Sequence, residues 1–140
     1  MTDPSPPSDP VSPAAEVTIL VCSSCRSPDD PAAEPRPGGA LVEDVRRAAE
    51  DAGEAAGVTV RRVACLGNCK RGLSAAVYRP GCWTYVFGGL QPGAGDDLVA
   101  AARLFAGAED GLMPFRGRPE ALKRGLIARV PPIDILKDLP

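Results

Sequence analysis

Two short segments rich in β-branched residues each run directly into a pair of cysteines. Residues 17–21 lead into a Cys-x-x-Cys pair, and residues 58–63 lead into a second pair with one more intervening residue, Cys-x-x-x-Cys. Such runs favour strands, and a strand–helix–strand unit crosses over right-handedly, so its two parallel strands end at the same edge of a sheet. We therefore expect four thiols to meet in one pocket at that edge. They belong to Cys22, Cys25, Cys65 and Cys69.

The segment between the two strands predicts the helix that this unit needs. From Leu41 to Ala52, apolar and small residues recur at helical spacing, and charged residues fall off that stripe. One face of this helix can therefore cover a sheet. Before it, residues 22–39 are rich in Pro, Ser and Asp, which predicts a loop.

The chain after the second cysteine pair predicts a hairpin and a further helix. Residues 73–78 and 83–87 flank a Pro-Gly turn, and the aromatic side chains of the second arm are interpreted as core packing. A helix capped by Asp96 or Asp97 is expected to end at Gly107. The order strand, helix, strand, strand, strand, helix predicts an α/β sandwich of the thioredoxin type with a four-stranded mixed sheet.

A length of 140 residues suits one domain with a single core. Residues 1–16 are rich in Pro and are expected to form a disordered tail, because they hold too few apolar side chains to offset ordering. Residues 17–110 are the expected thioredoxin-like metal-binding domain. Residues 111–140, in which a short helix can start at Pro119, are expected to form an extension that packs on the domain or on a partner subunit.

Charge and composition exclude several classes of function. A net charge of -2 is too balanced for non-specific binding of nucleic acid. Neither a basic start followed by an apolar run nor a stretch of about 18 apolar residues occurs, so we expect a cytoplasmic protein without membrane insertion. The chain has no histidine, which excludes Ser-His-Asp and Cys-His catalysis. No catalytic residue is assigned. The chemistry that remains for this chain is that of its cysteine thiolates.

Three interpretations fit the cysteine spacing. Two to four residues between paired cysteines suit a structural zinc site, and the same thiolates can hold an iron–sulfur cluster. In the third interpretation, Cys22 and Cys25 form the active site of a thiol oxidoreductase. Prolines after Cys25 disfavour a helix start there, no proline precedes Ser74 where a substrate-binding cis-proline would stand, and Cys65 and Cys69 would have no role. Spacing alone leaves zinc and iron–sulfur open.

Residues beside the cysteines suit a site that carries negative charge. Gly67 lets the backbone approach sulfur closely, while Arg26, Lys70 and Arg71 can stabilise a cluster that becomes more negative on reduction. Cys82 has no partner at ligand spacing and is interpreted as a free thiol.

Four stretches of the chain point to a known family. They are residues 22–26, 65–71 and 83–88, and residues 118–120 together with 128–132. These stretches resemble an uncharacterised bacterial family of predicted metal-binding proteins, short and Cys-rich, whose members often lie near cobalamin genes. That family is similar to the thioredoxin-fold 2Fe-2S ferredoxins, which are homodimers with one cluster per subunit.

The resemblance implies that Cys22, Cys25, Cys65 and Cys69 are the ligands of a 2Fe-2S cluster. It also implies an electron carrier of the ferredoxin kind and not an enzyme, with a redox protein as partner and a homodimer as assembly. The alternative is a structural zinc-binding or metal-delivery protein that uses the same four thiolates.

Overall fold

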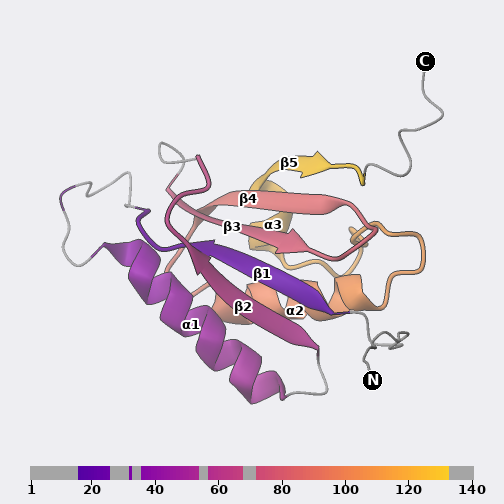
Figure 1. Cartoon of the computed structure of the whole chain (residues 1–140), viewed down its shortest axis with the longest axis horizontal. Helices are drawn as coiled ribbons and strands as arrows, with labels where there is room; N and C mark the ends of the chain where they lie inside the picture. The colour runs from indigo at the N-terminus through magenta and orange to yellow at the C-terminus, as the bar shows by residue number, and fades with distance from the viewer. Residues whose placement is uncertain (1–15, 26–31, 33–35, 54–56, 68–71, 133–140) are drawn as a thin grey trace, which may run out of the picture.

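The computed structural model describes residues 16–25, 32, 36–53, 57–67 and 72–132 (Figure 1). Within these ranges the order is one strand, one helix, three strands, two helices and a last strand. They are β1 (Val17–Cys22), α1 (Pro37–Ala52), β2 (Val58–Val63), β3 (Leu73–Tyr78), β4 (Thr84–Leu90), α2 (Gly95–Ala106), α3 (Glu120–Arg124) and β5 (Leu126–Val130).

One mixed sheet forms the centre of the described part, with its strands in the order β2-β1-β3-β4-β5. β1 and β2 are parallel, and Cys22 lies opposite Val63 at their carboxyl ends. β3, β4 and β5 each pair antiparallel with the preceding strand in that order. The expected α/β class, the mixed sheet and the parallel pairing of the first two strands are therefore confirmed.

The sheet has five strands, so the expectation of four is wrong. The additional strand, β5, comes from residues that we expected in a C-terminal extension, and it pairs with β4. Gly125 leads into it, and its carbonyl oxygen accepts a hydrogen bond from the Gly88 amide at 2.8 Å. The short helix expected at Pro119 is present as α3 and ends where β5 begins. The domain boundary near residue 110 itself stays a prediction.

Helix α1 begins earlier than its apolar stripe suggests. We expected a loop up to Gly39, but the helix starts at Pro37. Proline is well tolerated in the first turn of a helix, where its missing N–H has no helical partner and its fixed φ suits the helix. The Pro-Gly-Gly run therefore forms the first turn and not the end of the loop.

The core lies between α1, α2 and one face of the sheet. Residues of β1 alternate between buried and half-buried positions, and Val17, Ile19 and Val21 share one apolar cluster with both helices. Tyr85 and Phe87 of β4 are buried in this cluster, as the aromatic pattern predicted. The elements around the cysteines are thus held by a single core.

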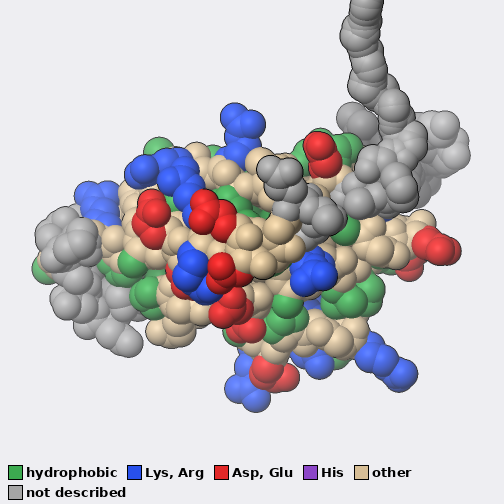
Figure 2. Space-filling model, turned by 90° about the horizontal axis from the view of Figure 1, so that it is seen from below, with side chains coloured by type: hydrophobic (Ala, Val, Ile, Leu, Met, Phe, Trp, Pro, Cys, Tyr) green, Lys and Arg blue, Asp and Glu red, His purple; other side chains and the backbone are tan. Residues whose placement is uncertain are grey.

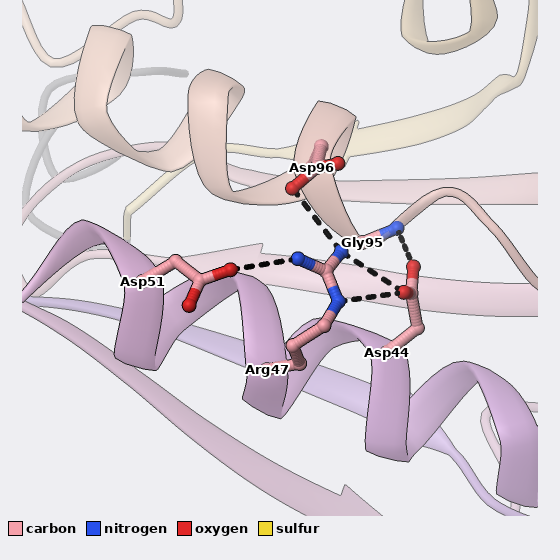
Figure 3. Close-up of polar contacts among 5 residues, drawn as sticks. All are labelled: Asp44, Arg47, Asp51, Gly95 and Asp96. Carbon is pink, nitrogen blue, oxygen red and sulfur yellow. Dashed lines mark hydrogen bonds and ion pairs between the residues drawn. The ribbon is translucent and has the colours of Figure 1, made fainter.

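A carboxylate on α1 caps the start of α2 (Figure 3). Gly95 donates its backbone N–H to Asp44 Oδ2 at 2.7 Å, and no side chain of α2 itself caps the helix, so the expected cap at Asp96 or Asp97 is wrong. Arg47 adds ion pairs to Asp44 at 3.0 Å and to Asp96 at 3.2 Å. The capping group comes from another helix because the backbones approach closely: a Cβ on Gly95 would lie 2.5 Å from the Asp44 carbonyl oxygen.

Acidic and basic side chains are interspersed on the face seen from below in Figure 2, which fits the balanced composition. None of the helices in the described ranges combines the length and the apolar character needed to cross a membrane.

We predict that Asp44→Ala lowers the free energy of unfolding by about 1–2 kcal/mol, because it removes a partly buried cap and its charge at a helix N-terminus. The control is Glu43→Ala, one position away, whose side chain is 72% exposed and which, among the described residues, forms an ion pair with Arg46 alone. That change should cost less than about 0.5 kcal/mol. Urea unfolding of the two variants measures both free energies. Equal decreases in the free energy of unfolding would contradict the role of Asp44 as a cap.

Candidate metal centre

The parallel strands bring the two cysteine pairs to one edge of the sheet. Cys22 is the last residue of β1, and the amide of the next residue, Ser23, donates to the Val63 carbonyl oxygen at 2.8 Å. Cys65 follows two residues after Val63, at the end of β2. Figure 1 shows β1 and β2 ending on the same side of the molecule. The loops after the two strands therefore face each other.

The sulfur of Cys22 lies against the loop that carries Cys65. Its thiol donates to the carbonyl oxygen of Ala64 at 3.7 Å, and the Ser24 hydroxyl donates to the same oxygen. The backbone N–H of Leu66 donates to the Cys22 sulfur. Because Ala64 and Leu66 flank Cys65 in the chain, these contacts join the first cysteine of one pair to the loop of the other.

Hydrogen bonds lower the pKa of Cys22 although its burial opposes ionisation. Only 1% of this residue is exposed, which disfavours the thiolate. The Cys25 thiol and the backbone N–H groups of Leu66 and Ser24 donate to the sulfur and outweigh that effect. A thiolate at Cys22 is thus stabilised by neighbours that the fold supplies.

Cys25 is the protonated partner of this pair in the metal-free protein. Burial is the largest of the causes that raise the pKa of Cys25. The hydrogen bond to Cys22 and the negative charge on Cys22 raise it further, to about 12. Ser74, at the start of β3, acts in the opposite direction, since its backbone N–H donates to the Cys25 sulfur and its side chain also lowers the pKa. Ser74 is itself fully buried, and its hydroxyl also lies within reach of the Gly72 carbonyl oxygen at 3.2 Å.

Cys65 differs from the first pair in being exposed. The Gly67 amide donates to its sulfur at 3.2 Å, in a backbone conformation with φ 76° that side-chain-bearing residues rarely adopt. The expected close approach of backbone to sulfur at Gly67 is therefore found.

Gly38 lets helix α1 pack directly on the Cys22–Cys25 turn. A Cβ at this position would lie 2.6 Å from the Cys22 carbonyl oxygen and 2.8 Å from the Cys25 nitrogen. The Gly38 amide also donates to the Cys25 carbonyl oxygen at 3.0 Å. Sequence reasoning missed this contact, and the only signal for it is a glycine in the first turn of a helix that follows the cysteine loop.

Part of the expected site lies outside the described residues. Cys69 is among these, so its position relative to the other three cysteines stays a prediction. Among the described residues, no three cysteine, histidine or carboxylate side chains form a group that could hold one metal ion. The four described cysteines, Cys82 included, form no disulfide with one another. The basic residues expected beside the ligands also lie outside the description, namely Arg26, Lys70 and Arg71.

The donors around the sulfurs fit a metal centre held by thiolates. Every described cysteine of the two pairs receives at least one N–H or O–H donor from the protein. Such donors favour the charged thiolate and hold ligand side chains in place. The set is one close pair of buried sulfurs and a third sulfur on the facing loop, all soft ligands of the kind that zinc and iron–sulfur clusters prefer.

A model of the family described as "Protein of unknown function (DUF1636)" matches residues 19–132. The chain belongs to this family. No curated protein matches the chain. The fold is similar to that of a thioredoxin-like [2Fe-2S] ferredoxin from Aquifex aeolicus, with a TM-score of 0.54 and 17% identity over 83% of this chain and 94% of that one. A second structure, of the wild-type protein from the same organism at 1.5 Å resolution, gives the same TM-score over 82% and 99% of the chains.

These comparisons confirm the thioredoxin-like fold that the order of strands and helices predicted. At 17% identity the likeness to the ferredoxins concerns the arrangement of the chain. The DUF1636 family itself carries no stated function, so what the cysteines do must be argued from the site.

Substitution of Gly38 should disturb this site selectively. We predict that Gly38→Ala lowers the free energy of unfolding by about 2 kcal/mol or more, because a methyl group would overlap the backbone of the cysteine turn. Gly39→Ala is the matched control, since nothing lies within 4 Å of a Cβ there. It should be neutral or stabilising by up to about 1 kcal/mol. Similar losses in urea unfolding for both variants would show that α1 does not rest on this turn.

In the metal-free protein, the cysteines should react with iodoacetamide in the order of their exposure. Cys65 is exposed and should be modified first, whereas Cys25 is 2% exposed and its raised pKa keeps it in the unreactive thiol form. Peptide mapping by mass spectrometry under native conditions gives the order. Modification of Cys25 as fast as Cys65 would contradict the described packing.

Proposed function

We propose that this protein is an electron carrier of the ferredoxin kind, in which Cys22, Cys25, Cys65 and Cys69 bind a 2Fe-2S cluster. The observation that carries the proposal is the contact of the Cys22 sulfur with the backbone on both sides of Cys65. It joins the two cysteine loops at one edge of a fold that is also found in thioredoxin-like [2Fe-2S] ferredoxins. When bound, the cluster would supply one-electron oxidation and reduction.

The protein's own contribution is to compensate the charge of the thiolates. N–H groups of Leu66 and Gly67 point at the sulfurs of Cys22 and Cys65, and Ser74 donates to Cys25. Hydrogen bonds to ligand sulfur favour the more negative state of a centre and so raise its reduction potential. These donors belong to the backbone and to one buried serine, so they stay in place when the charge changes.

The exposure of Cys65 supports exchange of electrons with another protein. A ligand at the surface brings the centre close to the partner, while Cys22 and Cys25 anchor the other end in the core. We also propose that the partner is a redox protein and that the protein acts as a homodimer.

A thiol oxidoreductase is the second candidate, and a specific contact favours it. The Cys25 thiol donates a hydrogen bond to Cys22, which stabilises one thiolate in a Cys-x-x-Cys pair as a dithiol active site requires. Two observations count against it: only 1% of Cys22 is exposed to a substrate, and the exposed Cys65 would have no part in the reaction.

The test is anaerobic purification of the full chain, followed by assays of iron, acid-labile sulfide and zinc and by visible absorption. We expect about two irons and two sulfides per chain, with charge-transfer bands in the visible range that bleach on reduction. Zinc without sulfide would replace the proposal by the structural or metal-delivery alternative. Absence of both metals together with disulfide reductase activity would favour the second candidate.

Two cysteine variants make the test specific to the site. Cys65→Ala should lose most of the iron and sulfide, because it removes a ligand. Cys82→Ala is the control: Cys82 is a half-buried thiol that forms no disulfide with the other described cysteines, and this variant should keep the full content. Equal retention in the two variants would exclude Cys65 as a ligand.

A further inference from the structure

A second candidate site lies away from the cysteines, under the loop between α2 and α3. A cavity of about 440 Å³ opens there between this loop and strands β4 and β5. Its volume is in the range of small-molecule sites. None of the described cysteines lines it. The lining residues are Tyr85, Asp110, Leu112, Met113, Pro114, Phe115, Arg118, Leu126 and Arg129.

Arg118 places a buried positive charge in this cavity. The residue is 8% exposed, and its guanidinium donates to the carbonyl oxygens of Met113 at 2.6 Å and Pro114 at 3.2 Å. It also lies over the rings of Tyr85 and Phe115, at 5.5 and 5.4 Å from their centroids. In the described part of the chain, no carboxylate forms an ion pair with it. A buried cation without a counter-ion is costly, so the free protein holds positive charge here at a disadvantage.

A second guanidinium lines the same cavity. Arg129, on β5, stacks on the Trp83 ring at 4.5 Å and has no ion pair with a described residue. Burial is the main cause that lowers the pKa of Arg118; Tyr85 acts in the opposite direction, and the charge of Arg129 lowers the pKa further. Two like charges at one concave site repel each other, and an anion between them would remove that repulsion.

Tyr85 adds a hydroxyl donor to the two guanidinium groups. Its oxygen accepts the Met113 amide at 2.9 Å, and the side chain is 2% exposed. Because Tyr85 lines the cavity and its oxygen is already an acceptor, its hydroxyl hydrogen can be donated to a ligand there. Asp110 is the carboxylate of the lining, and its Oδ1 accepts the Leu112 amide at 3.0 Å. The cavity therefore presents two guanidinium groups and a hydroxyl donor, which suit an anion with hydrogen-bond acceptors.

From this arrangement we infer that the cavity binds a small organic anion, with a carboxylate or phosphate head between Arg118 and Arg129 and an apolar body against the loop. Guanidinium groups match the geometry of both heads and can bind them through two parallel hydrogen bonds. Most of the remaining lining is apolar, with Leu112, Met113 and Leu126 among it, which favours an organic ligand over a bare inorganic ion.

The experiment titrates the full chain, as purified, with phenylacetate, phenylacetamide and inorganic phosphate at constant ionic strength, and follows backbone amides by NMR. We expect phenylacetate to cause saturable shifts at Leu112, Met113 and their neighbours. Phenylacetamide has the same apolar body without the charge and should bind at least about tenfold more weakly. Phosphate should bind more weakly than phenylacetate, because it lacks the apolar body.

Substitutions of Arg129 test whether phenylacetate binds at this cavity. They leave in place the hydrogen bonds from Arg118 that hold the loop. Arg129→Gln should weaken phenylacetate binding about fivefold to tenfold, and Arg129→Lys should restore part of it. The matched control is Arg61→Gln, an exposed arginine on β2 at the opposite edge of the sheet, which should change the affinity less than about twofold.

Several outcomes would overturn the inference. These are the absence of saturable shifts, equal binding of phenylacetate and phenylacetamide, binding of phosphate but not of phenylacetate, and equal effects of Arg129→Gln and Arg61→Gln. The assay does not depend on the metal content of the cysteine site, so its failure and that of the proposed function are distinguishable.

Discussion

The parallel pairing of β1 with β2 is the constraint on which the cysteine site depends. It sets Cys22 opposite Val63 and so brings the loop of Cys65 against the Cys22 sulfur. Helix α1, which joins the two strands, begins at the same edge and rests its first turn on the cysteine turn at Gly38. A side chain there would push the helix away from that turn, because the nearest atoms are backbone atoms that have little room to move. The crossover thus connects the two loops and also buttresses one of them.

Among the described residues, the donors to the thiolates are groups that few side-chain patterns reveal. The sequence led us to expect close backbone approach at Gly67 and basic side chains beside the cysteines; the basic side chains lie outside the described residues, and the described donors are backbone amides and Ser74. Any residue except proline carries such an amide, and only the conformation of the loop decides where it points. Gly67 is the exception, because its positive φ requires a residue without a side chain and so leaves a trace in the sequence.

The same distinction explains which parts of the fold could be predicted. β1 and β2 are runs whose composition favours strands on its own, β3 and β4 are marked by the Pro-Gly turn between them, and the order of these elements was enough for the fold class. β5 is short and becomes a strand only by pairing with β4, a contact between residues about forty positions apart. The prediction for the cap of α2 was wrong for a related reason. Acidic residues are present in the first turn of α2, but the group that accepts from the Gly95 amide is Asp44 of helix α1. The cavity at Arg118 was not foreseen, since its lining comes from two strands and a loop.

The two candidate sites carry opposite charges: thiolates at the cysteine edge suit a cation, and arginines at the cavity suit an anion. At the cysteine edge, hydrogen-bond donors contact the described sulfurs and favour thiolates, whose negative charge a metal centre would balance. At the cavity, the protein has assembled cations and a hydroxyl donor and lacks an anion. A structural role alone accounts for the hydrogen bonds that Arg118 makes to the loop, but it does not require a second arginine at the same cavity, which raises the cost of burying the first. That cost is easier to understand if an anion binds between the two, as it would offset the repulsion that the free protein carries.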